Sequence, residues 1–223
     1  MRSLHHYFYF IPLTLSAIFC LKAFRQKWPK PYRLYAWMII ITLFTEVFAG
    51  LWPYQLHTLF NASINNLWLY NLFILVRFGL LSVIFYLLLS RSIVKKILPA
   101  ATIGILIIGL LDYAFIHGPD QYNTYSMIIT HTLIIVLCML YFQQLLQEKN
   151  IIIIHKEPMV WMVLGIFIYH AVSLPYLIML GFLNISLLRL SHLFFPINIV
   201  LNILLCSCYL ISFLWKPQYS RLR

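Results

Sequence analysis

The chain has 223 residues, of which 63% are hydrophobic and only 9% are charged. An ordinary soluble domain has roughly 45–50% apolar and about 25% charged residues, so this composition excludes a typical soluble protein and indicates an integral membrane protein. The net charge of +11 comes without a basic domain or groove-entering motif, and it therefore predicts contact with the anionic lipid bilayer and no nucleic-acid partner.

Long apolar runs predict seven transmembrane helices, each close to the roughly 20 residues that cross the hydrocarbon core. In chain order they cover residues 7–24, 34–52, 67–90, 97–117, 125–146, 159–180 and 190–215. Residues that favour turns separate several of them, such as Gly118, Pro119 and Asp120 before the fifth helix. The prediction is an all-α, polytopic membrane protein with one transmembrane domain over residues 1–223 and no soluble domain.

Basic residues gather on one side of the predicted helices. Thirteen of the 16 flank the first, third and fifth connections and the tail, namely Lys22, Arg25, Lys27, Lys30, Arg33, Arg91, Lys95, Lys96, Lys149, Lys156, Lys216, Arg221 and Arg223. The opposite side has only Arg2 and Arg189, and Arg77 lies inside a helix. The positive-inside rule then predicts an outer N-terminus and a cytoplasmic C-terminus, and we expect the plasma membrane as the location.

Two predicted helices share a spaced pattern. In the second helix Glu46 follows Trp37 by nine residues, and in the sixth His170 follows Trp161 by the same distance, with a Pro-Tyr pair after each. The pattern predicts parallel repeats formed by helices 1–3 and 5–7 and joined by helix 4. The alternative is chance similarity between apolar segments.

A three-plus-one-plus-three plan with an outer N-terminus resembles the SWEET and PQ-loop transporters in architecture. The likeness is one of architecture only, namely two parallel three-helix repeats joined by a single helix. The Pro-Gln signature of those families belongs to the first and fifth helices, whereas here Pro217-Gln218 lies in the tail. No functional residue is therefore carried over from the resemblance.

Polar side chains within the predicted helices indicate a cavity, because an ionisable group in a bilayer costs about 3 kcal/mol or more unless it has a partner or water. The candidate ligand or ion-pair cavity comprises Glu46, Tyr70, Asn71, Arg77, Asp112, His131, His170, Ser173, Asn198 and Asn202. Most of these lie in the predicted outer half or near the midplane, while the inner halves of the helices are largely aliphatic and aromatic. We expect a polar cavity that is open to the outside and closed within.

Arg77 is the most informative of these residues, because its guanidinium stays charged. At roughly 15 Å below the outer end of its helix it is too deep to reach the interface, and Glu46, at roughly 9 Å on the neighbouring helix, is its predicted counter-ion. One reading is an inert pair that fixes helix packing. The others are an anchor for an anion or polar ligand that shares Arg77 with Glu46, and a proton-coupled switch.

The leading functional prediction is a small-solute transporter or a ligand-binding membrane protein with an outward-facing polar cavity. The apolar inner halves argue against a transporter and fit a sensor better. The alternative is a membrane subunit or oligomeric pore that acts with a protein partner or as a homo-oligomer. In that case the charged residues would face a neighbouring subunit.

A third class is an intramembrane metal-dependent hydrolase, since histidine and carboxylate residues are suitable zinc ligands. The topology resembles the seven-helix ceramidase-type hydrolases, which carry a paired H-x3-H on a late helix. Here Pro196 stands four residues after His192, so the motif is missing. The sequence favours a protein that is not an enzyme, and we assign no catalytic residue, metal ligand or cofactor.

Overall fold

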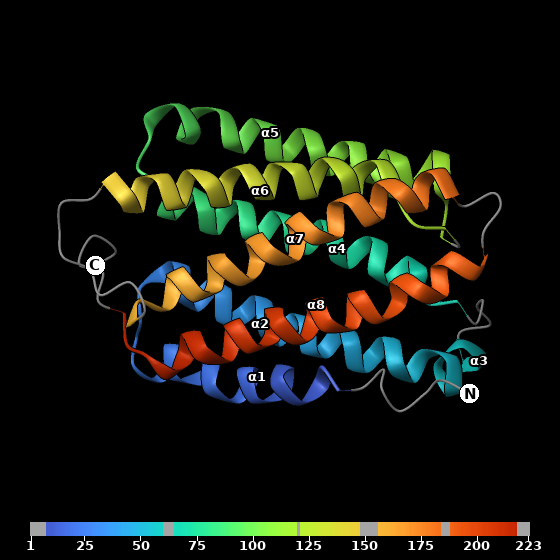
Figure 1. The fold of residues 1–223 in the computed structure, drawn as a ribbon, viewed down its shortest axis with the longest axis horizontal. Coiled ribbons are helices and arrows are strands. Elements are labelled where there is room, and N and C mark those ends of the chain that lie inside the picture. The colour runs from blue at the N-terminus through green and yellow to red at the C-terminus, as the bar shows by residue number, and fades with distance from the viewer. Residues whose placement is uncertain (1–7, 60–64, 120, 148–155, 184–187, 218–223) are drawn as a thin grey trace.

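The computed structural model describes residues 8–59, 65–119, 121–147, 156–183 and 188–217 as a bundle of helices that run along its long axis (Figure 1). The helices are α1 (Phe10–Arg25), α2 (Lys30–Leu51), α3 (His57–Leu59), α4 (Leu67–Leu88), α5 (Ser92–Leu111), α6 (Thr124–Gln147), α7 (Pro158–Leu183) and α8 (Leu188–Leu214). Single π-helical turns extend α2 over Trp52–Leu56 and α5 over Asp112–His117. No strand occurs among the described residues, and the all-α prediction is confirmed.

Six helices form a closed ring in the order α1, α2, α4, α6, α7 and α8, and α8 packs back against α1. Helix α5 lies outside this ring against α4 and α6, at the upper edge of Figure 1. Only Leu98 and Gly109 of α5 are buried, whereas Ile93, Ile103 and Ile107 are more than half exposed. The ring therefore encloses the interior, and α5 covers part of its outer face.

Six helical segments are long and apolar enough to cross a membrane: Lys30–Leu51, Leu67–Leu88, Ser92–His117, Thr124–Gln147, Pro158–Pro175 and Pro196–Leu214. Large apolar side chains are exposed over the surface, such as Phe44 at 71% and Phe115 at 82%. Water would disfavour so much exposed apolar surface, whereas lipid accommodates it. Helix α1 has 16 residues and is about 24 Å long, so the structure supports six of the seven predicted spans.

The interior is closely packed at one end of the ring. This end, called the basic end below, carries the described basic residues Lys22, Arg25, Lys27, Lys30, Arg33, Arg91, Lys95, Lys96, Lys156 and Lys216. Buried aromatic rings fill it: Trp28 stacks on Phe213 with ring centroids 5.7 Å apart, and Tyr35 meets Tyr209 edge to face at 5.2 Å. The opposite end of the ring, called the cavity end, is hollow.

Two polar side chains buried at the basic end, Glu157 and Gln144, have hydrogen-bond partners. Glu157 is fully buried and accepts a hydrogen bond from the hydroxyl of Tyr32. Gln144 of α6 accepts hydrogen bonds from the backbone N–H and the hydroxyl of Ser90, at 2.8 and 3.0 Å, and donates one to the carbonyl of Leu88 at 3.2 Å. These bonds join α2 to α7 and α4 to α6 where the helices end, and they reinforce the closed half.

Helices α7 and α8 approach closely at Gly165. A Cβ atom added at this residue would lie 2.7 Å from Cβ of Cys208, which is closer than two such carbons can approach. Gly104 of α5 has nothing within 4 Å of the same position. The glycine is therefore required at the interface, as small residues commonly are where membrane helices meet.

We predict that Gly165→Ala lowers the free energy of unfolding by about 1–3 kcal/mol, because the added methyl group overpacks the α7–α8 interface. The matched control Gly104→Ala should be neutral or stabilising by up to about 1 kcal/mol, since alanine favours the helix. Thermal unfolding of the two variants in the same detergent measures the difference. Equal melting temperatures would contradict the close approach of the helices.

Candidate functional site

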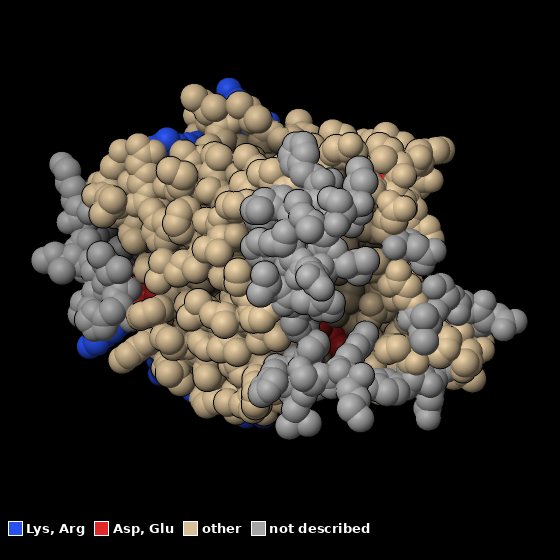
Figure 2. Space-filling view, turned by 45° about the vertical axis from the view of Figure 1, so that its right-hand side comes forward, with Lys and Arg blue, Asp and Glu red and all other residues tan. Residues whose placement is uncertain are grey.

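A cavity of about 650 Å³ occupies the cavity end of the ring. All six ring helices line it, and the lining includes no residue of α5. On α4 the lining begins near Asn66 and ends at Phe78, so the cavity extends about 18 Å along the bundle axis. In the space-filling view of Figure 2, atoms of acidic residues (red) are visible inside a recess of the surface.

Glu46 of α2 lies on the cavity wall, where two tyrosines hold its carboxylate. The hydroxyl of Tyr9 donates to Oε2 at 2.8 Å, and the hydroxyl of Tyr70 donates to the same atom at 3.0 Å. Oε1 has no hydrogen-bond partner among the described residues. The carboxylate thus joins α1, α2 and α4, and within the described ranges of the chain one of its oxygens stays unbonded.

Arg77 lies deeper, at the floor of the cavity. Its Nη2 donates to the hydroxyl of Tyr209 at 3.3 Å, and the guanidinium stands over the ring of Tyr169 with Cζ 5.1 Å from the centroid. Its Nε is buried and has no partner among the described residues. All the groups that hold Arg77 are therefore formally neutral.

The predicted ion pair between Glu46 and Arg77 is wrong. Among the described residues, the ion pair between His117 and Asp112 is the only one within 4 Å. The reason is depth: Glu46 is bonded to Tyr70, which precedes Arg77 on α4 by seven residues, or about 10 Å along the helix. Arg77 is left without a carboxylate partner in the part of the chain that the structure describes.

Two histidines lie against each other on the cavity wall. The rings of His131 and His170 have centroids 4.3 Å apart and an interplanar angle of 66°. Nδ1 of His131 is 2.9 Å from the carbonyl oxygen of Met127, and this acceptor requires the proton on Nδ1. His170 is only 4% exposed, and neither of its ring nitrogens has a partner among the described residues.

The other predicted lining residues bond mainly within their own helices. The Ser173 hydroxyl donates to the carbonyl of Tyr169 at 2.5 Å. Nδ2 of Asn202 donates to the backbone oxygen and the Oδ1 of Asn198, at 2.8 and 3.1 Å. Eight of the ten residues predicted for the cavity line it: Glu46, Tyr70, Arg77, His131, His170, Ser173, Asn198 and Asn202.

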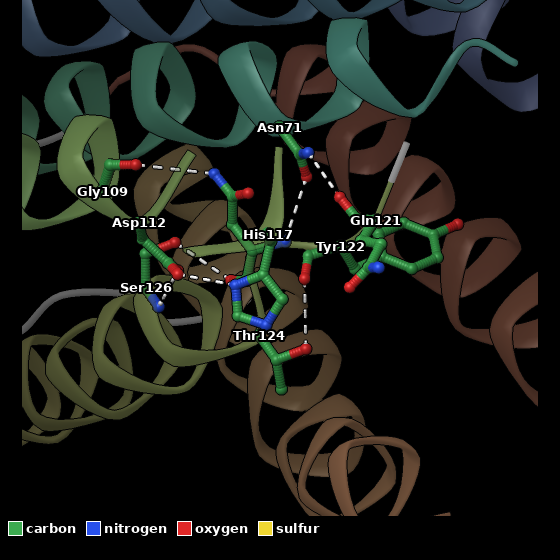
Figure 3. A network of polar contacts seen from close by, with 9 residues as sticks. Asn71, Gly109, Asp112, His117, Gln121, Tyr122, Thr124 and Ser126 are labelled. Carbon is green, nitrogen blue, oxygen red and sulfur yellow. Dashed lines mark hydrogen bonds and ion pairs between the residues drawn. The ribbon is translucent and has the colours of Figure 1, made fainter. Parts of the chain in front are cut away.

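Asn71 and Asp112 are not part of the cavity lining, in contrast to the sequence prediction. Both belong to a polar network at the start of α6 (Figure 3). Asn71 donates to the carbonyl of Gln121 at 2.8 Å and accepts from the backbone N–H of Asn123 at 3.3 Å. Asp112 lies 2.6 Å from Nδ1 of His117 and accepts from the backbone N–H of Ser126 at 3.1 Å.

This network explains why the two residues differ from the rest of the predicted set. Asn71 is six residues from Arg77, which turns its side chain about 240° away around α4. Asp112 belongs to α5, which lies outside the ring. The backbone groups that they bond lie in the connection to α6 and in its first turn, where helical partners are lacking. The two side chains therefore join α4, α5 and α6.

Three tyrosines that hold the charged residues of the site are not in the candidate cavity set. Tyr9 holds Glu46, while Tyr169 and Tyr209 hold Arg77. A buried tyrosine hydroxyl needs a hydrogen-bond partner, so tyrosines at the depth of a charged residue were a usable signal.

The arrangement offers no metal centre among the described residues, where no three histidine, cysteine, aspartate or glutamate side chains come together. The described site therefore gives no support to the metal-dependent hydrolase reading. Its chemistry is that of hydrogen-bond donors, one carboxylate and one guanidinium. Comparisons of the chain with protein-family models, curated proteins and solved structures give no match.

We predict that Asn71→Ala lowers the free energy of unfolding by about 1–3 kcal/mol, because it leaves the Gln121 carbonyl and the Asn123 N–H without their partner. The control Thr132→Val should change stability little, since the Thr132 hydroxyl is exposed and bonds only the carbonyl of Ile128 on its own helix. Thermal unfolding in detergent compares the two. A neutral Asn71→Ala would show that the network does not stabilise the bundle.

Proposed function

We propose that this integral membrane protein binds a small solute in the cavity enclosed by the six ring helices. The observation that carries the proposal is a cavity of about 650 Å³ whose floor holds an arginine without a counter-ion among the described residues. Pockets of roughly 300–1,000 Å³ with a few convergent polar groups are typical of small-molecule sites. Nε of Arg77 and both ring nitrogens of His170 are buried without a partner among the described residues, and a polar solute bound beside them would supply one.

The structure gives more support to a protein that binds a solute than to one that carries the solute across the membrane. A transporter needs access to its site from both faces, whereas the basic end is filled by buried aromatic and aliphatic side chains such as Tyr35, Phe85 and Phe213. The floor made by Arg77 and Tyr209 rests directly on this packed region, because Tyr209 contacts Tyr35. We therefore favour a solute receptor or sensor over a transporter.

For the topology we propose seven spans with the N-terminus outside and the protein in the plasma membrane. Helix α1 packs between α2 and α8 in the ring, and its exposed residues Ile11, Leu15 and Ile18 suit contact with lipid. Basic residues at one end favour a cytoplasmic location for that end. The cavity would then face the outer solution.

The three-plus-one-plus-three repeat remains part of the proposal. Helices α1, α2 and α4 are consecutive neighbours in the ring, as are α6, α7 and α8, while α5 lies outside the ring against α4 of one group and α6 of the other. This is the placement that a linker helix between two parallel three-helix units would have.

We predict that a stabilising solute found by thermal screening of the purified protein will act through the cavity. At about 100 times its dissociation constant, such a solute should stabilise the wild type by about 2.7 kcal/mol by mass action. Arg77→Gln and Glu46→Gln should lose this shift, whereas Lys96→Gln, which removes an exposed charge at the basic end, should retain it.

The same screen can reject the proposal. If no solute shifts the wild type while Arg77→Gln and Glu46→Gln both unfold at lower temperature, the two residues are structural. The function would then be sought with a protein partner or in a homo-oligomer.

We predict that a membrane-impermeant maleimide labels Gln121→Cys on intact cells, but labels Lys96→Cys only after the membrane is permeabilised. Gln121 is exposed at the cavity end and Lys96 at the basic end. The unmodified protein is the control for its own cysteines, of which Cys20, Cys138 and Cys206 are buried and Cys208 is half-buried. The reverse labelling pattern would overturn the proposed orientation.

A further inference from the structure

We propose that the solute is an organic monocarboxylate whose carboxylate binds Arg77 at the floor of the cavity. This inference rests on the proposed function and names the chemical class of the ligand. It starts from an imbalance of charge: a guanidinium cannot neutralise itself by losing a proton, and an enclosed ion without a counter-ion is costly. Arg77 has no anionic partner within 4 Å among the described residues.

The groups around Arg77 do not remove this imbalance. Tyr209 of α8 and Tyr169 of α7 provide a hydroxyl and a ring face, and His131 and His170 line the same cavity as neutral or cationic groups. Glu46, the one carboxylate in the lining, is held by the hydroxyls of two tyrosines nearer the cavity end. An anion is therefore the component that the floor lacks.

The orientation of the Arg77 guanidinium favours a carboxylate over other anions as its ligand. The ring of Tyr169 covers one face of the guanidinium, so the N–H groups along its edge are the available donors. A planar carboxylate matches that edge with two parallel hydrogen bonds. Nε is buried without a partner, and the unbonded ring nitrogens of His170 could add a further donor on the same wall.

The rest of the lining favours an organic body over an inorganic ion. Apolar side chains from all six ring helices line the cavity, including Phe10, Leu13, Phe73, Ile134 and Leu205. A volume of about 650 Å³ far exceeds a single small anion, and buried apolar surface adds affinity for a hydrocarbon or aromatic body. The body would extend from Arg77 toward the cavity end.

Glu46 selects against a second negative charge on the ligand. Its carboxylate is bonded to the hydroxyl of Tyr70, which lies two helical turns nearer the cavity end of α4 than Arg77 does. A dianion that filled the cavity would place its second charge near the free Oε1 of Glu46, where like charges repel. A single negative charge at the deep end avoids this repulsion.

The test uses the intact purified protein and matched probe pairs that differ in charge but hardly in shape. Benzoate is compared with benzamide, and 2-naphthoate with 2-naphthamide, at pH 7 and constant ionic strength, with sodium chloride as the inorganic-anion arm. We expect the two carboxylates to raise the melting temperature and the amides and chloride to leave it unchanged. The amides also control for partition into the detergent.

Three variants locate the interaction. Arg77→Gln should weaken carboxylate binding by about 10- to 100-fold, the usual effect of losing a hydrogen bond to a charged group. Arg77→Lys keeps the charge but loses the planar fork, so it should weaken binding by about tenfold or more, and it serves if Arg77→Gln does not fold. Lys96→Gln should bind as the wild type does.

The outcomes separate this inference from the proposed function. A neutral or cationic solute that stabilises the wild type while carboxylates do not would overturn the carboxylate inference and leave the solute cavity standing. Equal shifts by chloride and the carboxylates, or unchanged binding by Arg77→Gln and Arg77→Lys, would also overturn it. If no probe and no other solute shifts the wild type, the proposed function itself fails.

Discussion

The hydrogen bonds that Tyr9 and Tyr70 donate to Glu46 determine the charge balance of the whole cavity. The two hydroxyls hold the carboxylate on the cavity wall. They donate the hydrogen bonds that Arg77 would have donated in an ion pair with Glu46. Arg77 consequently rests on a tyrosine ring and a tyrosine hydroxyl. In a bundle surrounded by lipid, a polar group can find hydrogen-bond partners only within the protein or its cavity. Because Glu46 is bonded to two tyrosines, the positive charge of Arg77 at the floor is not neutralised by it.

The two halves of the ring helices have different chemistry, although the same six helices build both. Toward the basic end they bring together aromatic and aliphatic side chains that pack without space for a solute. Toward the cavity end they bring tyrosine, histidine, asparagine and one charge of each sign. Tyr209 stands at the boundary, because it bonds Arg77 on one side and contacts Tyr35 on the other. The floor is thus part of both the binding region and the core.

The sequence predicted those features that depend on position along a helix. Apolar runs located the long helices, and the ionisable residues inside them indicated most of the cavity lining, because depth follows from the rise per residue. The direction in which a helix turns each side chain, and which helices lie next to one another, depend on how the helices pack, and the sequence of a single helix does not determine this. Asp112 has a suitable depth but lies on the helix outside the ring, and Glu46 has the right charge for Arg77 but lies too far along the axis. Tyr9, Tyr169 and Tyr209 were outside the candidate set, because which tyrosine hydroxyls meet a charged group depends on that same packing.

The position of α5 outside the ring has a consequence for how the chain can change over time. More than half of its residues are exposed, on the side turned away from α4 and α6, so any apolar side chain of moderate helix propensity serves equally well at those positions. The ring helices are constrained on two sides, by lipid and by their neighbours. Sequence drift should therefore be fast along α5 and slow along α7 and α8, and relatives of this chain are best sought by weighting the ring helices alone.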